Sequence, residues 1–436
     1  MQLKKTPIKN IRSQMRLATC VLLQAAAPVA HAAEGDWDID TAVLYYGEGD
    51  GRVQAFEPGI SASREMGDDE RLSMRMVVDA LTGSTPNGAH ASTVVQTFTN
   101  PSGNGVYTVV PGELPLNDTF HDTRVALGLD WEKPIDRLSK IIWGASLSSE
   151  IDYQSLGVSA TYLQDMNNRN TTLTAGIALG SDKVKPIGHV PDPLTPMRIS
   201  GTQNRLGADD TKTITELMLG ITQVISRRTL MQLNFTYGKS DGYLNDYNKV
   251  LSVVDSTGAL LPTGWASAGD LPYLYEKRPD LRTRNALFFK TVHHLEEDVI
   301  NFSYRYFWDD WGITSHTLDM KYRYEMNAGN YLQPHLRYYM QDAADFYKHD
   351  LVQGAGADVD LAGNVLVNFA SSDYRLAEFD SITLGLKYGF PVGDTSEFSA
   401  RAEIITQTTN DGNVRAGEET PDLTAVVLQA NYSFKW

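Results

Sequence analysis

Hydrophobic and polar residues alternate along most of this chain, and the alternation is clearest at its carboxy-terminus. From residue 424 to 436, one face carries Tyr432, Phe434 and Trp436, and the other carries Gln429 and Asn431. Successive side chains of a strand point to opposite faces, so a period of two predicts a β-strand. Sixteen such segments, of about 9 to 13 residues each, are found at approximately 36–47, 52–64, 70–80, 122–132, 139–149, 155–165, 170–181, 213–225, 229–239, 283–295, 298–309, 313–325, 331–341, 376–390, 397–408 and 423–436.

The connections between these segments fall into two classes. Every second connection is short, as at 67–69, 167–169 and 296–297, whereas the long segments 81–121, 182–212, 240–282, 342–375 and 409–422 all belong to the other set. A large soluble all-β protein, which is the alternative, has no reason to keep its turns short on one side only. The pattern therefore predicts an all-β fold: a transmembrane antiparallel up-and-down β-barrel with short periplasmic turns and long extracellular loops.

The face opposite the apolar one would line the lumen of such a barrel. A charge facing lipid at mid-depth would cost about 2 to 4 kcal/mol, so the charged positions must face water or each other. Both signs are interleaved among them, which leaves two possibilities: a polar passage for solutes, or ion pairs across the lumen that plug it. The predicted lumen-lining residues are Arg71, Arg75, Asp79, Arg124, Asp130, Arg305, Asp319, Lys321, Arg323, Glu325, Arg337, Arg401 and Glu403.

The amino-terminus has the features of a cleaved secretory signal. Basic residues precede an alanine-rich apolar run that ends in Ala30, His31 and Ala32, so we expect cleavage before Ala33 or one residue later. Residues 1–32 would then be the signal peptide, and 33–436 a single barrel domain. Cys20 is the only cysteine and lies within the signal; a lipoprotein is disfavoured because the apolar run follows this cysteine. The mature chain would have no cysteine chemistry.

Composition narrows the functional classes further. The formal net charge is -16 and no basic stripe compensates it, so we expect no nucleic-acid binding. Beyond the signal, no apolar run is long enough for a transmembrane helix. We expect no cofactor.

Three groups of side chains could carry chemistry. Ser315 and His316 could suggest a hydrolase, but neighbouring strand residues point to opposite faces and could not share a proton. His293 and His294 near an acidic turn could suggest a metal site, with the same objection. The loop aspartates, among them Asp358, could bind divalent cations, yet no calcium-binding loop is present. We therefore expect neither an enzyme nor a metal protein.

Several loop sequences resemble a known family. They are DALTGSTPNGA at 79–89, GELPLNDTF at 112–120 with 122–124, GYLND at 242–246, YEKRPD at 275–280, DDWGI at 309–313 with 315–317, and SDYRL at 372–376. The chain is similar to the domain of unknown function 3570 family, although Tyr247 and Asn248 depart from the Pro-Tyr expected there. The resemblance implies an outer-membrane barrel of unknown role that accompanies extracytoplasmic redox or flavin-transfer proteins, and it supplies no catalytic residues.

The terminal strand also resembles the closing strand of bacterial outer-membrane barrels, in which the aromatic residues at the positions of Tyr432, Phe434 and Trp436 form an assembly signal. We therefore expect the outer membrane of a Gram-negative cell, with both termini periplasmic. Expected partners are outer-membrane lipid, lipopolysaccharide and the barrel assembly machinery. The favoured function is a passive, porin-like channel for small hydrophilic solutes or ions. The alternative is a non-conducting scaffold for a periplasmic or surface redox partner.

Overall fold

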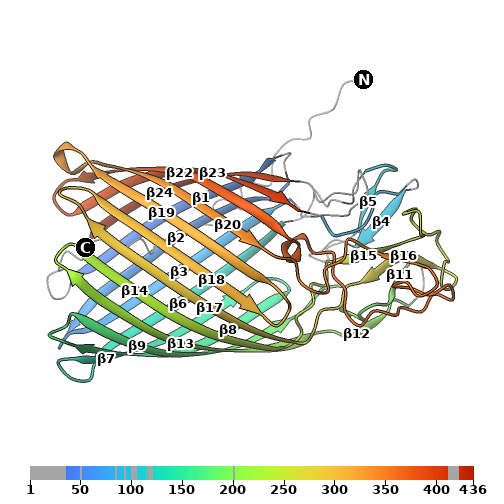
Figure 1. Cartoon of the computed structure of the whole chain (residues 1–436), viewed down its shortest axis with the longest axis horizontal. Coiled ribbons are helices and arrows are strands. Elements are labelled where there is room, and N and C mark those ends of the chain that lie inside the picture. The colour runs from blue at the N-terminus through green and yellow to red at the C-terminus, as the bar shows by residue number, and fades with distance from the viewer. Residues whose placement is uncertain are drawn as a thin grey trace.

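A computed structural model describes residues 36–49, 52–83, 86–92, 95–99, 106–113, 115, 121–199, 202–410 and 422–436, so the expected signal peptide lies outside the described residues. Sixteen strands form one closed antiparallel barrel in chain order (Figure 1). They are β1 (Trp37–Glu48), β2 (Gln54–Gly67), β3 (Glu70–Thr82), β6 (His121–Pro134), β7 (Ser139–Ser149), β8 (Tyr153–Met166), β9 (Thr171–Val184), β13 (Asp210–Ser226), β14 (Thr229–Gly242), β17 (Leu281–His294), β18 (Val299–Asp309), β19 (Thr314–Glu325), β20 (Tyr331–Gln341), β22 (Phe379–Val392), β23 (Ser396–Thr409) and β24 (Leu423–Lys435).

The predicted barrel is confirmed, strand for strand. The first and last strands close it: β1 pairs with β24, and Trp37 and Trp436 exchange two backbone hydrogen bonds of 2.8 and 2.9 Å. Short turns lie at one end of the barrel, as predicted, and the long connections lie at the other (Figure 1). The turn between β2 and β3 has positive φ at both Asp68 and Asp69, the conformation that fits the twist of a tight hairpin.

The outer surface of the barrel is apolar. Along β24, Val426 and Leu428 are 40 and 48% exposed, whereas Ala425 and Gln429 on the inner face are 1 and 4% exposed. Large apolar residues are likewise exposed on most other barrel strands, Leu384 on β22 among them. A continuous apolar belt of this kind is unfavourable in water and matches the lipid-facing band of a transmembrane barrel. Among the described residues, no helix is long and apolar enough to cross a membrane.

The long connections fold into a small domain, here called the loop cap, at one end of the barrel. It comprises the described residues between β3 and β6, β9 and β13, β14 and β17, and β20 and β22 (Figure 1). Its main sheet has the order β11-β16-β15-β21, and β4-β5 and β10-β12 form two smaller sheets. The cap strands are β4 (Gln96–Thr99), β5 (Val106–Val109), β10 (Val190–Pro191), β11 (Pro196–Arg198), β12 (Arg205–Gly207), β15 (Val250–Val254), β16 (Asp270–Tyr275) and β21 (Asp350–Val352).

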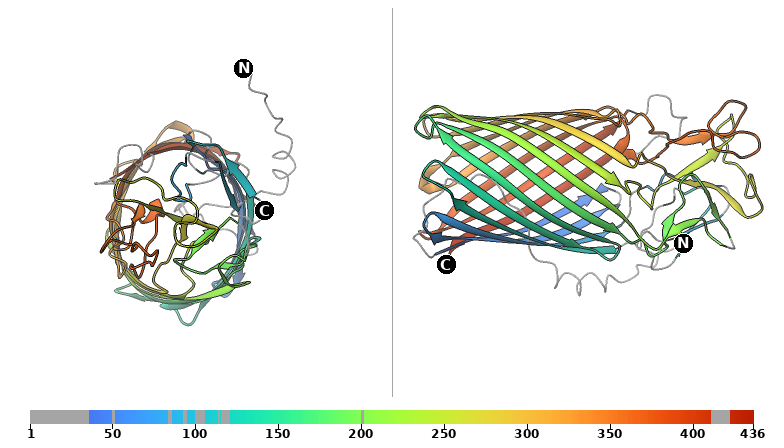
Figure 2. Two further views of the ribbon diagram at one scale, coloured as in Figure 1. Left: turned by 90° about the vertical axis from the view of Figure 1, so that its right-hand side faces the viewer. Right: turned by 90° about the horizontal axis from the view of Figure 1, so that it is seen from below.

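The cap has its own hydrophobic core, which makes it a folded unit. Leu251, Val253, Leu274, Leu351 and Val359 are fully buried together, although they come from two different connections. Seen along the barrel from the cap side, the cap segments lie over the barrel opening (Figure 2). The cap was not predicted, because its strands are too short for a clear period of two.

Candidate functional site

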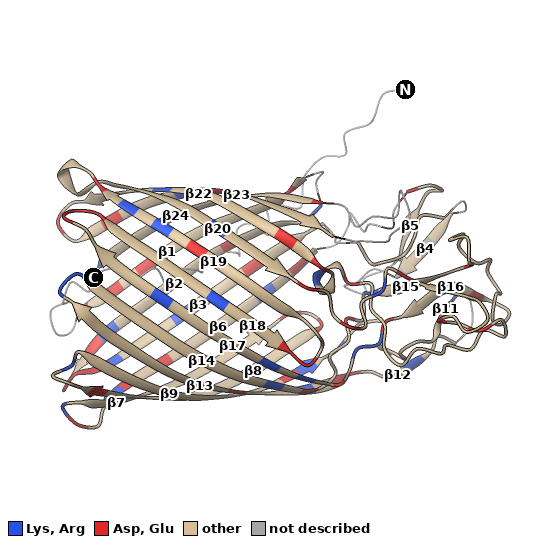
Figure 3. Cartoon of the chain, in the orientation of Figure 1, with Lys and Arg blue, Asp and Glu red and all other residues tan. Residues whose placement is uncertain are grey.

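Charged residues of both signs are interleaved along the barrel strands (Figure 3). The structure pairs many of the predicted lumen residues within the barrel wall. Arg124 binds Asp79 on the neighbouring strand, Arg323 binds Glu325 on its own strand, and Arg71 lies 3.9 Å from Asp38 with only β2 between them. Among the described barrel residues, every ion pair joins positions on the same strand, on adjacent strands, or with one strand between. The described ion pairs therefore follow the wall and do not cross the lumen.

One set of wall contacts extends over four strands and is centred on His335 of β20. Its Nε2 lies 2.8 Å from Asp319 on β19, and its Nδ1 lies 2.8 Å from Glu403 on β23. Because β22 stands between β20 and β23, the second contact must pass over a residue of β22, and that residue is Gly385. A Cβ atom there would lie 2.7 Å from the Cγ of Glu403, so the missing side chain makes room for the bridge.

The remaining predicted lumen residues divide into paired and unpaired groups. Lys321 lies 3.9 Å from Asp319, and Arg401 lies 3.3 Å from Glu403. With the residues that the structure describes, Arg75, Asp130, Arg305 and Arg337 form no ion pair. The charges of these four side chains are therefore not balanced by an ion pair among the described residues.

A cavity of about 330 Å³ lies where the cap meets the barrel, and we call it the mouth cavity. Arg278, Arg375 and Leu376 line it from the cap, and Arg305, Phe307 and Ser315 line it from the barrel. Most of its guanidinium groups have carboxylate partners; Arg282, which also lines it, binds Asp309 at 2.6 Å. Arg305 has no carboxylate partner among the described residues, and its guanidinium lies 5.0 Å from the ring of Phe307.

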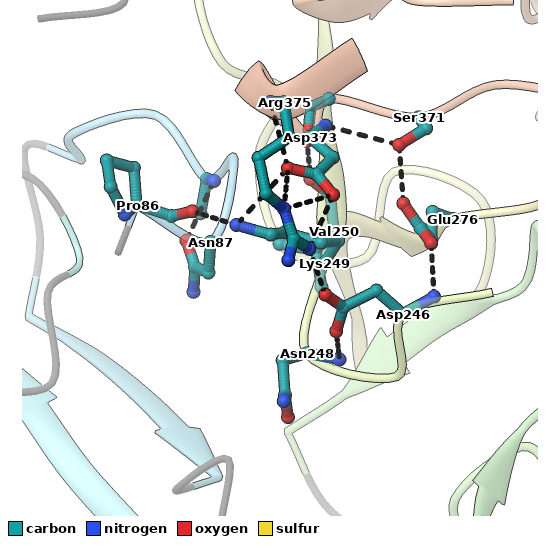
Figure 4. A network of polar contacts seen from close by, with 12 residues as sticks. Pro86, Asn87, Asp246, Asn248, Lys249, Val250, Glu276, Ser371, Asp373 and Arg375 are labelled. Carbon is teal, nitrogen blue, oxygen red and sulfur yellow. Dashed lines mark hydrogen bonds and ion pairs between the residues drawn. The ribbon is translucent and has the colours of Figure 1, made fainter. Parts of the chain in front are cut away.

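Beside the mouth cavity, a network of mostly buried charges joins separate segments of the cap (Figure 4). Arg375 binds Asp246 and Asp373 at 2.6 Å, and Lys249 lies 3.9 Å from Asp373. Lys249 also donates a 2.6 Å hydrogen bond to the carbonyl oxygen of Pro86, which ties in the connection after β3. The whole set, here called the cap network, is Asp246, Lys249, Glu276, Arg278, Asp373 and Arg375.

The cap network balances three cations against three anions, and four of the six side chains are almost fully buried, whereas Arg375 is 57% and Asp246 23% exposed. Lys249, Glu276 and Asp373 are 3, 2 and 1% exposed. Burial disfavours a charged Asp373, but the cations of Lys249, Arg375 and Arg278 prevail and hold the pKa of that carboxyl well below its usual range. For Glu276 burial prevails and raises the pKa, even though Arg278 opposes the shift. Removing a buried member such as Lys249 would leave an uncompensated buried charge.

In each of the two residue pairs considered for catalysis or metal binding, the side chains have different contacts. Ser315 lines the mouth cavity, whereas His316 contacts the hydroxyl of Tyr304 at 2.7 Å, so the two side chains diverge. His293 contacts the hydroxyl of Thr229 at 2.9 Å, and His294 contacts the carbonyl oxygen of Leu295. Neither pair is a shared site.

The loop aspartates have structural partners. Asp209 binds Lys183 at 3.0 Å and Asp358 binds Lys348 at 2.9 Å. Asp360 accepts backbone hydrogen bonds that shape its own turn. At the cap end of β6 and β7, the carboxylates of Asp122, Glu150 and Asp152 converge, and burial together with Asp122 raises the pKa of Glu150 to about 7.

Residues 12–434 match the family described as "Protein of unknown function (DUF3570)". The chain belongs to this family. The resemblance drawn from the loop motifs is thereby confirmed. In the structure, three of these motifs contribute residues to the cap network. The DUF3570 segments at 242–246, 275–280 and 372–376 supply Asp246, Glu276, Arg278, Asp373 and Arg375 of the cap network.

Solved structures similar to this chain include two outer-membrane proteins and a hydrocarbon channel. A "Bacterial polysaccharide outer membrane secretin" has a TM-score of 0.42 at 7% identity, covering 93% of this DUF3570 chain and 100% of the other. The outer membrane protein opdK from Pseudomonas aeruginosa has a TM-score of 0.38 at 10% identity, covering 92 and 99%. The CymD monoaromatic hydrocarbon channel has a TM-score of 0.39 at 7% identity, covering 93 and 89%. No curated protein sequence matches the chain.

Proposed function

We propose that this DUF3570 protein is a passive channel of the bacterial outer membrane for small hydrophilic solutes or ions. The short turns and both termini face the periplasm, and the loop cap faces the outside, as in barrels whose periplasmic turns are short and whose extracellular loops are long. The proposed partners are outer-membrane lipid and lipopolysaccharide on the apolar belt, and the barrel assembly machinery at the terminal strand.

The observation that carries the proposal is the direction of the ion pairs. A lumen plugged by its own charges would need partners that meet across the bore, whereas the described pairs run along the wall, as in the bridge from Asp319 through His335 to Glu403. Paired charges in a wall give a polar, hydrated lining without filling the space between opposite walls. Charges with no described partner, such as Arg75 and Asp130, remain available to solutes.

The mouth cavity is the proposed entry filter. A solute that passes between cap and barrel meets Arg305, whose guanidinium has no carboxylate partner among the described residues, beside the Ser315 hydroxyl. A guanidinium sheltered from bulk water attracts carboxylate, phosphate or halide groups more strongly than an exposed one does. We therefore propose that the mouth cavity favours anionic groups.

Single-channel recording tests this function. The purified mature barrel is inserted into a planar bilayer, and conductance and reversal potential are measured across a salt gradient. We expect discrete conductance steps. Silence at every voltage, from protein that migrates as a folded barrel on an unheated gel, contradicts the proposal.

The cap itself supports a second candidate. A folded unit with its own core lies over the barrel opening (Figure 2), which favours a non-conducting scaffold that presents the cap to a redox partner. The two candidates differ in one measurement. Weakening the cap network by Lys249→Met increases conductance or leaves it measurable in a channel, whereas a scaffold whose barrel is closed along its length stays silent.

A further inference from the structure

Three potential metal ligands converge inside the loop cap, away from the mouth cavity. The Nε2 atom of His90 lies 3.2 Å from Nδ1 of His349 and 3.7 Å from a carboxylate oxygen of Asp350. The Nδ1 atom of His349 lies 3.9 Å from the same oxygen. The three ligand atoms thus form a small triangle, and the two imidazole rings are tilted by 42° with centroids 4.9 Å apart.

The backbone holds this triangle in place from two separate connections. The backbone N–H of His90, which follows β3, donates a 2.8 Å hydrogen bond to the hydroxyl of Ser252 on β15. Ser252 also pairs with Asp350 in the parallel ladder between β15 and β21, and His349 directly precedes Asp350. Since Ser252 is fully buried, both connections are fixed to one rigid point of the cap sheet.

The spacing of the triangle suits a tetrahedral metal ion. Bonds of about 2.0 to 2.1 Å at tetrahedral angles place ligand atoms about 3.4 Å apart. The observed separations of 3.2, 3.7 and 3.9 Å lie around that value, so an ion fits with side-chain shifts of a few tenths of an ångström. The side chains of His90, His349 and Asp350 are 9, 24 and 14% exposed, which leaves a path for the ion and shelters it from bulk water.

We propose that His90, His349 and Asp350 bind one divalent transition-metal ion, with Zn²⁺ as the reference ion. Two imidazole nitrogens and one carboxylate oxygen favour Zn²⁺, Co²⁺, Ni²⁺ or Cu²⁺ over Ca²⁺ and Mg²⁺, which prefer all-oxygen sites. Three protein ligands leave the fourth position to water or to a ligand from outside the cell. Bound metal joins the connection after β3 to the connection after β20, and so stiffens the cap.

The competing explanation is a hydrogen bond between the two imidazoles. A neutral His90 could donate from Nε2 to Nδ1 of His349, with Asp350 as a nearby acceptor. That arrangement needs no ion and gives no stoichiometric metal binding, so the two explanations are separable by titration. Sequence reasoning missed the cluster because 259 positions separate His90 from His349.

The test is calorimetric titration of the full mature barrel in detergent, stripped of metal with a chelator and then dialysed, using ZnCl₂ alone as the probe. We expect one ion per chain. His90→Ala and Asp350→Asn should each weaken binding by at least about 100-fold, beyond the 10- to 100-fold typical of losing an outer-shell group. Co²⁺ should give visible absorption of a tetrahedral site, and His349→Ala should abolish it.

Two matched variants control for binding elsewhere. His294→Ala removes a surface histidine near a periplasmic turn, and Glu150→Gln alters the only other described cluster of three or more potential ligands. Both should bind Zn²⁺ as the unaltered protein does. If His90→Ala fails to fold, as judged by its migration on an unheated gel, His349→Ala provides the same test at the most exposed ligand.

Three results overturn the proposal. They are no heat of binding at millimolar ZnCl₂, stoichiometric binding that survives in a folded His349→Ala variant, and competition by Ca²⁺ at equal concentration. Because the readouts are binding heat and Co²⁺ absorption, they are independent of whether the barrel conducts.

Discussion

The bridge over Gly385 leads to a quantitative prediction about the barrel wall. Gly385→Ala places a Cβ atom 2.7 Å from Cγ and 2.9 Å from Oε1 of Glu403, so the carboxylate must move away from His335. The lost contact is a charge-assisted hydrogen bond of 2.8 Å between side chains that are 10 and 8% exposed. Such a bond contributes about 1.5 to 3 kcal/mol, while replacing a strand glycine by alanine returns about 0.5 to 1 kcal/mol. We expect a net loss of about 1 to 2 kcal/mol in the free energy of unfolding.

The assay is urea unfolding of the barrel in lipid vesicles, followed by migration on unheated gels. Gly128→Ala is the matched control, because its Cβ would meet only the Cβ of Arg75 at an ordinary distance of 3.8 Å. That substitution should be neutral or stabilise the barrel by up to about 1 kcal/mol. In a Glu403→Ala background, Gly385→Ala has no carboxylate to displace and should cost nothing. The reasoning is refuted if Gly385→Ala destabilises the barrel equally with and without Glu403.

Three further predictions concern the mouth and the cap. Arg305→Ala should lower the anion-to-cation permeability ratio by about two- to fivefold, which corresponds to about 0.4 to 1 kcal/mol for one partly screened charge; an unchanged reversal potential contradicts it. Lys249→Met leaves Asp373 buried with one cation fewer and should destabilise the cap by about 3 to 5 kcal/mol. The loss should be seen as new protease cuts within 243–280. As a control, Lys185→Met at an exposed position should change stability by less than about 0.5 kcal/mol. Acidification should also destabilise the cap. Because the pKa of Asp373 is lowered in the folded protein, the contribution of this carboxylate to stability is complete above the unfolded value of 3.8 and is lost as pH falls below it. Pepsin cuts in the cap should increase below that pH, and cuts that do not depend on pH would count against the network.

The sequence predicts the barrel well because the signal for a strand is local. A period of two can be recognised within ten residues, and Val426 and Leu428 show their outward direction by that period alone. The contacts within the wall could not be predicted, because the approach of His335 to Glu403 depends on the register of three strands. A glycine inside a strand, as at Gly385, is the one signal that could have indicated a close approach.

The cap escaped prediction for a different reason. Val250–Val254 is a short apolar run without alternation, which fits a buried strand and a buried loop equally well. The motifs that identified the family contain five of the six residues of the cap network, in separate pieces, and Lys249 lies outside them. Their meeting around Lys249 and Asp373 is a product of tertiary structure, as is the convergence of His90 with His349.

The strands follow one another around the barrel in chain order, and the pairing of β1 with β24 closes the ring. The barrel could therefore begin and end at a different strand and keep the same strand pairs. Trp37 and Trp436 are joined by two backbone hydrogen bonds, so a few residues would suffice to link them covalently. The chain could then be opened at the tight turn between β22 and β23, around Gly393, without altering any strand pair. Circular permutation of this kind would separate the terminal aromatic residues from the carboxy-terminus itself, and would test whether their place at the chain end matters for folding of the barrel.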